Sequence, residues 1–233
     1  MTAVAAIRTA RARARAELTE EIKTAARCHV AESGAAALSL RAVARELGMA
    51  SSALYRYFPS RDDLLTALIV DSYAALATTL RAADREAVPR ERWVAVCHAW
   101  RDWAVQHPHE YALIYGTPVP GYRAPHDTVQ PAADVLLVLV DVVRDVAAAG
   151  ALRPIEVPPL APELVAQLEH VQSTHAEGVP LPVLARLFEA FGQLLGTITL
   201  ELFGHFVGSV DPSGPFYELT VVELADRLGL PES

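Results

Sequence analysis

The chain has 233 residues, of which 52% are hydrophobic, and it carries a formal net charge of −8. This length and apolar content allow one or two folded domains and exclude the disordered class. With only two cysteines, Cys28 and Cys97, and no apolar segment of a signal peptide at the N-terminus, the sequence predicts a cytoplasmic protein without a disulfide framework.

The charge is divided unevenly along the chain. Through Arg61 there are 10 Lys and Arg against 5 Asp and Glu, a balance of +5. The remainder has 10 against 23, a balance of −13, and the two balances give the total of −8. A basic head on an acidic body is expected when only one end of a protein approaches phosphate.

Residues 1–16 are rich in alanine and arginine and predict a basic arm, partly helical, that gains order on DNA. The alternative is a solvated tail. The arginines of this arm are Arg8, Arg11, Arg13 and Arg15. The first helix of a DNA-binding unit is predicted at residues 19–34, because apolar residues follow a helical spacing there. These residues are Leu18, Ile22, Ala25, Ala26 and Val30.

Residues 39–61 have the pattern of a helix, a tight turn and a second short helix. Leu40, Val43, Ala44 and Leu47 share one face of the first helix, which Ser39 caps and Gly48 ends. Ser51 or Ser52 is expected to cap the second helix. Pro59 ends it, because proline cannot continue a helix.

The second helix is predicted to have two different faces. Leu54 and Phe58 look inward with Ala53 and Tyr57, whereas the outward face presents hydroxyls and a guanidinium, which suit phosphate oxygens and base edges in a major groove. A third helix follows at once. Ser60 and Asp63 have the spacing of a capping box, and Arg61 sits beside this positive helix end, where phosphate is favoured.

The run LRAVARELGMASSALYRYFPSRDDLLTAL resembles the DNA-binding signature of the tetracycline-repressor (TetR) family of bacterial regulators. The match covers about the first third of the chain. Ala53 falls where some members have a polar base-contacting residue, which weakens direct readout at that position. The alternative is a three-helix unit that packs well but binds no DNA. By position, the resemblance implies DNA contacts from Arg41, Ser51, Ser52, Tyr55, Arg56, Tyr57 and Arg61.

A connecting helix is predicted from Ser60 to about Ala83, in a linking segment at residues 62–87. Such a helix spans roughly 35 Å, enough to join the head to a second domain mechanically.

The second domain, residues 88–233, opens with a helix at residues 91–107 that holds all three tryptophans, followed by a short helix at Pro108. The run W-x-x-W-A-x-x-H-P-x-x-Y, followed by GTPVPGYRAP, resembles the ligand domain of many actinobacterial TetR-family proteins. An effector pocket is therefore predicted there, covered by a rigid Pro-rich loop at residues 116–126. Core packing is the alternative for each tryptophan. The predicted lining residues are Trp93, Cys97, Trp100, Trp103, Tyr111, Tyr115 and Tyr122.

Helices are also predicted at residues 131–149, after the Pro-rich connection 154–162, and at residues 182–207 and 216–228. The last pair is expected to form a homodimer surface, with core packing as the alternative for each residue. Its candidates are Phe188, Phe191, Leu195 and Phe206. The predicted fold is all-α, with an N-terminal helix-turn-helix domain at residues 17–61 and a C-terminal helical domain for ligand binding and dimerisation. The apolar windows 135–146 and 191–208 fall short of the roughly 20 residues of a membrane span.

Catalysis, a cofactor and a metal site are not predicted. His107, His109 and Glu110 offer zinc ligand types without a further ligand, and Cys97 and His98 are neighbours whose side chains diverge on a helix. The motifs of hydrolases, nucleotide-binding proteins and metalloproteases are absent. The sequence therefore predicts a ligand-responsive regulator, a repressor released from a palindromic operator by a small apolar or aromatic molecule. The alternative is a small-molecule-binding protein or enzyme whose DNA-binding head is incidental.

Overall fold

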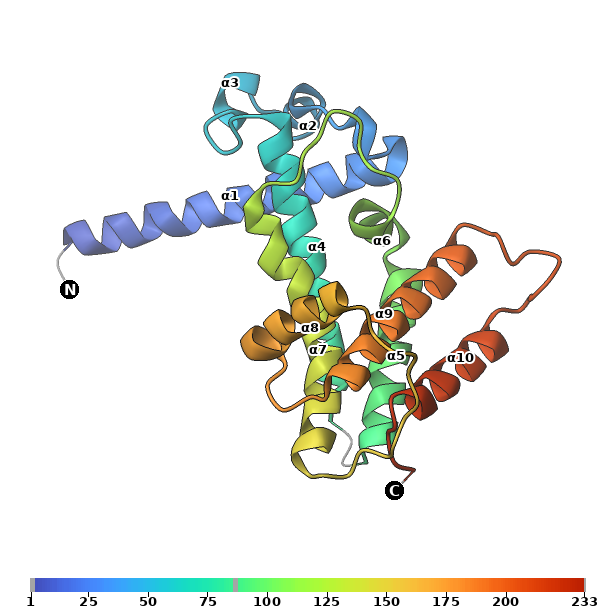
Figure 1. The fold of residues 1–233 in the computed structure, drawn as a ribbon. Coiled ribbons are helices and arrows are strands. Elements are labelled where there is room, and N and C mark those ends of the chain that lie inside the picture. The colour runs from blue at the N-terminus through green and yellow to red at the C-terminus, as the bar shows by residue number, and fades with distance from the viewer. Residues whose placement is uncertain (1–2, 86–87, 233) are drawn as a thin grey trace. The chain divides into compact units, whose positions relative to one another are not determined.

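The computed structural model describes residues 3–85 and 88–232, with side chains from residue 10 onward. The described residues are helical and contain no strand, which confirms the predicted all-α class (Figure 1). The helices are α1 (Ala3–Ser33), α2 (Leu40–Glu46), α3 (Ser51–Leu54), α4 (Arg61–Ala83), α5 (Pro89–Gln106), α6 (Pro108–Tyr115), α7 (Val129–Ala148), α8 (Pro162–His175), α9 (Leu181–Leu202) and α10 (Gly214–Arg227), with short 3-10 helices at Ala35–Ala37 and His126–Thr128.

The chain forms two compact units. One unit, here called the head, comprises residues 1–72 and 109–128, and the other, here called the body, comprises residues 73–108 and 129–233. The chain crosses between them within α4, after Pro108 and after Thr128. The α4 helix therefore belongs to both units, the arrangement expected of a mechanical link.

Local signals explain the ends of the head helices. Gly48 has φ 65° after α2, a left-handed backbone that glycine adopts without steric cost. At α4, the Ser60 hydroxyl accepts from the Asp63 backbone N–H (3.1 Å), which is the N-cap bond of the predicted capping box, and it donates to Asp63 Oδ2 (2.7 Å). The N-cap of α3 is Ala50, so the expectation that Ser51 or Ser52 caps this helix is wrong.

The head has its own apolar core. Ile22 of α1, Val43 of α2, Leu54 of α3 and Leu65 of α4 are fully buried, each worth about 1.5–3 kcal/mol of transfer free energy. The segment 116–128 belongs to this unit, and the hydroxyls of Tyr122 and Thr66 on α4 are 2.9 Å apart. The Pro-rich loop is therefore hydrogen-bonded to α4.

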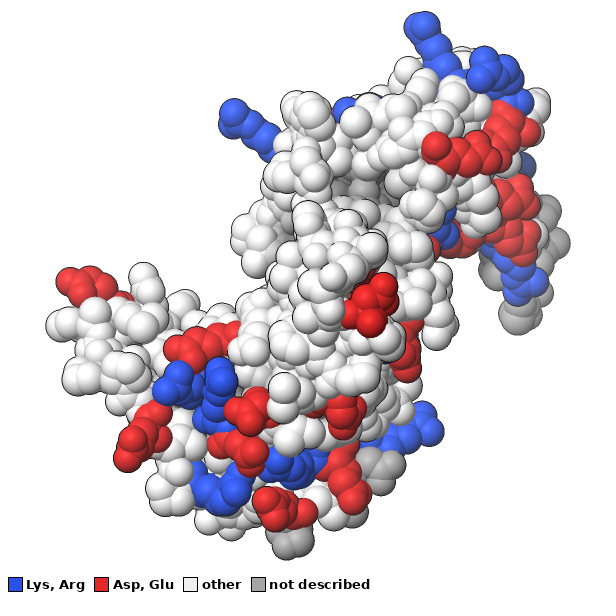
Figure 2. Space-filling model, turned by 90° about the vertical axis from the view of Figure 1, so that its right-hand side faces the viewer, with Lys and Arg blue, Asp and Glu red and all other residues white. Residues whose placement is uncertain are grey.

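The body is built around α5, α7, α9 and α10. The indole of Trp93 on α5 donates to the Val221 carbonyl of α10 (3.0 Å), and the Tyr217 hydroxyl donates to the Cys97 carbonyl (2.6 Å). Arg101 of α5 donates to Glu201 of α9 (2.7 Å). On the face shown in Figure 2, basic and acidic side chains are interleaved over the lower part of the molecule. This mixture is consistent with the ion pairs of the body.

Within the described part of the chain, two helices, α4 and α9, are long and apolar enough to cross a membrane by length and composition, with 44% and 39% of the relevant windows buried. A core helix of a soluble protein passes the same test, so this is weak evidence for a span. The α9 helix ends at Leu202, earlier than the expected residue 207. Gly204 follows with φ 76°, which turns the chain there.

Candidate DNA-binding interface

Residues 51–58, here called the recognition segment, comprise α3 and the turn that follows it, and they have the two faces that the sequence predicts. Leu54 and Phe58 are 0% and 7% exposed, and they anchor the segment in the head. Ser52 and Arg56 are exposed, Tyr55 is 43% exposed and Ser51 is half-buried. A short helix held by apolar anchors and presenting hydroxyl and guanidinium groups can enter a major groove and reach phosphates or base edges.

Tyr57, which the sequence places on the inward face, is half-buried. The guanidinium carbon of Arg15 lies 4.9 Å from the centroid of its ring, and Arg15 Nη2 donates to the Arg56 carbonyl (3.1 Å). Arg15 comes from α1, so the end of the recognition segment is held by a residue of the predicted basic arm. The side chain of Arg8 lies outside the described residues.

Arg61 has partners within the head. Its Nε donates to the Leu38 carbonyl (3.1 Å), and its Nη2 donates to the carbonyls of Ala35 (3.0 Å) and Ala36 (3.1 Å). Its side chain is 30% exposed, and Nη1 lies 3.7 Å from a carboxylate oxygen of Asp62. Arg61 therefore ties the turn before α2 to the start of α4, a role that the sequence motif did not reveal. Arg41, on α2, is exposed.

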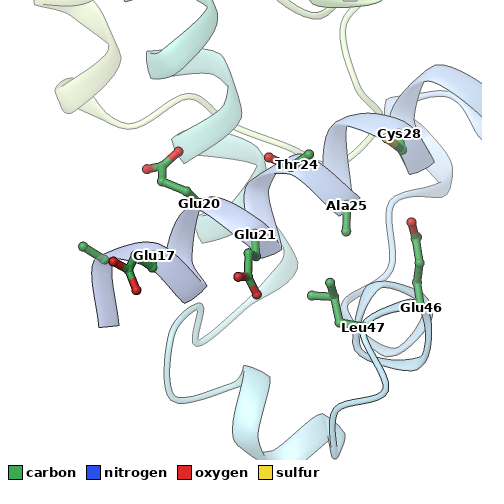
Figure 3. A pocket seen from close by; sticks show the side chains of 9 residues that line it. Glu17, Glu20, Glu21, Thr24, Ala25, Cys28, Glu46 and Leu47 are labelled. Carbon is green, nitrogen blue, oxygen red and sulfur yellow. The ribbon is translucent and has the colours of Figure 1, made fainter. Parts of the chain in front are cut away.

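An acidic groove of about 800 Å³ lies on the head between α1 and the end of α2 (Figure 3). Its lining combines four carboxylates with small and apolar groups: Ala16, Glu17, Glu20, Glu21, Thr24, Ala25, Cys28, Glu46 and Leu47. Because these carboxylates repel phosphate, DNA is not expected to approach this side. The groove is therefore not assigned to the candidate DNA-binding surface.

The predicted effector residues are divided between the two units. Trp93, Cys97, Trp100 and Trp103 of α5 belong to the body and are 0–4% exposed. Trp100 lies 5.2 Å from Phe191, and burial raises the pKa of the Cys97 thiol well above its ordinary value. A buried thiol with a raised pKa is a poor nucleophile, so Cys97 acts as an apolar core residue in this arrangement.

The remaining three predicted effector residues belong to the head. Tyr111 is fully buried, with its ring 5.3 Å from that of Tyr115. Tyr122 is half-buried and shares the hydrogen bond with Thr66. The sequence pattern did not reveal this division, because both sets of residues follow the same aromatic spacing.

The histidine cluster does not form a metal site among the described residues, which contain no group of three potential ligands. His107 stacks on Trp103 at 5.2 Å, and its Nδ1 lies 3.0 Å from the Trp103 carbonyl. His107 is thus held at the end of α5 by its contacts with Trp103.

The body has a groove of about 460 Å³ between α8 and α9 that the sequence analysis missed. Phe188 and Leu164, on its edge, are 40% and 39% exposed. It has an apolar lining with two polar residues: Leu160, Leu164, Gln167, Leu168, Val171, Ala185, Phe188 and Glu189. The apolar spacing of each helix was visible, but the pairing of α8 with α9 was not.

Comparison with known families agrees with this architecture. Residues 22–68 match the family of bacterial regulatory proteins known as the tetR family, and residues 93–224 match the tetracyclin repressor-like C-terminal domain. The chain therefore belongs to the TetR family, and it is a DNA-binding transcriptional regulator. The resemblance inferred from the sequence is confirmed.

Particular relatives extend the match to most of the chain. The HTH-type transcriptional regulator Rv1816 of Mycobacterium tuberculosis is 38% identical over 199 residues, which cover 83% of this chain and 84% of that protein. The crystal structure of SCO4313 has 37% identity and a TM-score of 0.73, covering 92% of this chain and 98% of that one. PfmR from Thermus thermophilus, with 17% identity and a TM-score of 0.54 over 91% of this chain and 98% of that one, shares the fold.

Proposed function

We propose that this regulator is a repressor, that it binds a palindromic operator as a homodimer, and that a small apolar or aromatic molecule releases it. The observation that carries the proposal is the outer face of the recognition segment, where Ser52, Tyr55 and Arg56 are accessible and Leu54 and Phe58 are buried. A repressor acts by occupying its operator, which needs only this face and a second copy of it.

Each candidate contact has a role that follows from its chemistry. Arg56 can donate two hydrogen bonds to a guanine edge, so we assign it to base readout, with Ser51, Ser52 and Tyr55 beside it. Arg41, exposed on α2, is assigned to a phosphate. We assign Arg61 to a phosphate through its Nη1 group, because its Nε and Nη2 donate to backbone carbonyls. Tyr57 supports the surface from beneath Arg15.

The outer face of α9 supports the homodimer. Phe188, Gly192 and Phe203 are exposed, and Leu195 and Thr199 are half-buried, along one helical stripe. A Cβ atom at Gly192 would meet nothing within 4 Å, so a partner helix could approach closely there. The α8–α9 groove borders this stripe at Phe188. One short recognition helix buries too little surface for operator-level affinity, whereas two read a palindrome with half-sites about one helical turn apart.

Two of the four dimer candidates have other partners. Phe191 packs on Trp100 at 5.2 Å, and Phe206 meets Phe216 edge-on at 5.6 Å. We therefore centre the proposed dimer contacts on Phe188 and the exposed residues of its stripe, Gly192 and Phe203. We include α10 through Leu219, which is 56% exposed.

For the effector, we propose a site beside the aromatic residues of α5, because small-molecule sites are mostly apolar with a few orienting polar groups. Trp93 and Trp100 are fully buried in the structure, so the ligand must select a more open conformation of the body. Residues of α4 belong to both units. A ligand that favours a displaced α4 would change the separation of the two recognition helices and weaken DNA binding.

We further propose that the protein works by binding alone, in the cytoplasm, without catalysis, cofactor or membrane attachment. The cytoplasm is the compartment that holds the DNA bound by such a head. Cys97 is buried with a raised pKa, and the neighbouring His98 Nε2 lies 2.7 Å from a carboxylate oxygen of Glu218, so these two residues do not support a nucleophile and base pair.

The test is binding of the purified protein to a labelled duplex from the region upstream of its own gene. We expect a specific complex that contains two chains per site and survives an excess of random-sequence duplex. A footprint should show two protected half-sites related by a twofold axis. Equal affinity for the upstream and random duplexes would overturn operator recognition, and one chain per site would overturn the dimer.

A further inference from the structure

The α1 helix does not end where the packed part of the head ends. It continues without a break to Ala3, and the side chains of Arg11, Arg13 and Arg15 are exposed on this extension. The arm is thus already helical in the free protein. The sequence predicted instead an arm that is partly helical and gains order on DNA.

The helical register separates these arginines into two faces. At about 100° per residue, Arg11 and Arg15 lie about 40° apart, and Arg11 lies about 20° from Ile22. Ile22 is fully buried in the head. The face that packs on the head therefore continues outward as Arg15 and then Arg11.

Arg13 lies on the other side of α1. It is about 200° from Arg11 but only about 20° from Glu20, which lines the acidic groove. The same helix thus has a basic side that continues from the head core and an acidic side on the groove. Charge alone does not distinguish Arg11 from Arg13, but the register does.

Arg15 connects the basic side to the recognition segment. Its Nη2 donates to the Arg56 carbonyl (3.1 Å), and its guanidinium carbon lies 4.9 Å from the centre of the Tyr57 ring. Its own carbonyl accepts a hydrogen bond from the Thr19 hydroxyl (2.8 Å). The arm therefore begins at the edge of the DNA-binding face, and Arg11 lies one helical turn, about 6 Å, further along α1.

From this geometry we propose that α1 is a second DNA-contact element, in which Arg11 binds a backbone phosphate outside the half-site read by α3 and Arg15 positions Arg56 and Tyr57. The inference rests on the proposed operator binding. The ligand is duplex DNA, because the basic side of α1 starts beside Arg56 of the recognition segment. The basic side would face the phosphates, because the carboxylates on the opposite side of the helix repel them.

The test compares Arg11→Ala, Arg13→Ala and Arg15→Ala in the full chain. Arg11 and Arg13 are exposed, so Arg11→Ala and Arg13→Ala should keep the helical content and melting temperature of the wild type, whereas Arg15→Ala, which also loses the bond to Arg56, should keep the helical content. The probes are a labelled duplex from the upstream region and a random-sequence duplex of equal length, titrated over a series of salt concentrations. Arg13→Ala is the matched control, because it removes the same charge from the same arm on the opposite face.

We expect Arg11→Ala to reduce the slope of log affinity against log salt by about one on both duplexes. Arg13→Ala should keep the wild-type slope. Arg15→Ala should reduce the preference for the upstream duplex over the random one, as the loss of a positioning residue would. A slope unchanged by Arg11→Ala, or reduced equally by Arg13→Ala, would overturn the inference.

Failure of the arm and failure of the proposed function give different results. A wild-type protein that binds neither duplex contradicts the proposed function itself. A wild-type protein that binds the upstream duplex, loses this binding on Arg56→Ala and keeps its salt slope on Arg11→Ala contradicts only the arm.

Discussion

The side chain of Arg61 donates a hydrogen bond from Nε to the backbone carbonyl of Leu38, at 3.1 Å and across 23 residues of the chain. Two further bonds from Nη2 reach Ala35 and Ala36. The residue expected at a phosphate thus also holds the segment before α2 against the start of α4. These two roles make different demands, since the clamp needs the planar guanidinium and the phosphate contact needs only the charge.

We therefore predict that Arg61→Ala and Arg61→Lys both lower the free energy of unfolding, by about 1 kcal/mol, because part-buried backbone carbonyls lose a charged donor. Arg61→Lys should keep the salt slope of DNA binding, whereas Arg61→Ala should lower it by about one. Urea unfolding and binding titrations measure the two effects. If Arg61→Ala leaves the slope unchanged, Arg61 makes no phosphate contact and acts only as the clamp.

Arg56→Ala and Arg41→Ala should differ in specificity. Loss of Arg56 should cost about 1–3 kcal/mol of discrimination between the upstream and random duplexes, because a base contact is removed. Loss of Arg41 should weaken binding to both duplexes alike and lower the salt slope. Arg81→Ala, which removes an exposed charge of the body, serves as the control. The assignment of Arg56 to a base fails if its variant discriminates as well as the wild type does.

Phe188→Glu should convert the proposed homodimer to a monomer, because it places a charge on the apolar stripe of α9. Sedimentation at micromolar concentration measures the mass of the protein in solution. Operator affinity should fall when the dimer is lost. Val105→Glu is a control, since Val105 is also exposed (49%) but lies on α5. A Phe188→Glu protein that remains dimeric would show that the dimer interface does not include this stripe.

Acid should weaken a cluster that ties α10 to the rest of the body. Hydrogen bonds from Arg90 (2.7 Å) and Arg153 (2.7 Å) lower the pKa of Asp226 to about 2. Because this pKa is below the unfolded value of about 3.9, the stabilisation is fully present above pH 4 and is lost as pH falls toward 2. The carboxylate is 45% exposed, so solvent screening limits the effect to about 0.5–1 kcal/mol.

Asp226→Asn should accordingly be less stable than the wild type at pH 7, and the difference should shrink between pH 4 and pH 2. Urea unfolding at a series of pH values measures it. A difference in stability that stays constant over this range would show that the carboxylate charge is not the cause.

The effector mechanism predicts reciprocal coupling. Because all three tryptophans lie on α5, their fluorescence should report binding of a small aromatic compound to the body. The factor by which such a compound weakens operator binding must equal the factor by which the operator weakens binding of the compound. A compound that binds tightly without changing operator affinity would contradict the mechanism while leaving the site intact.

Local sequence signals were sufficient for the all-helical class, for the end of α2 and the start of α4, and for the family. The spacing from Leu40 to Leu47, the glycine at position 48 and the Ser60–Asp63 pair each act within one or two helical turns, so their structural meaning is contained in neighbouring residues. The two faces of α3 follow from the same periodicity. The continuous α1 did not follow, because the arm lacks the bulky apolar side chains that mark a packed helix.

The tertiary structure alone decided which side chains meet. Arg15 reaches Arg56 across 41 residues, Tyr122 reaches Thr66 across 56, and Trp93 reaches Val221 across 128. A local pattern contains no information about such partners, because they are set by how the helices pack. This is why an arginine read as a phosphate ligand also serves as a clamp, and why residues with one aromatic spacing belong to two different units.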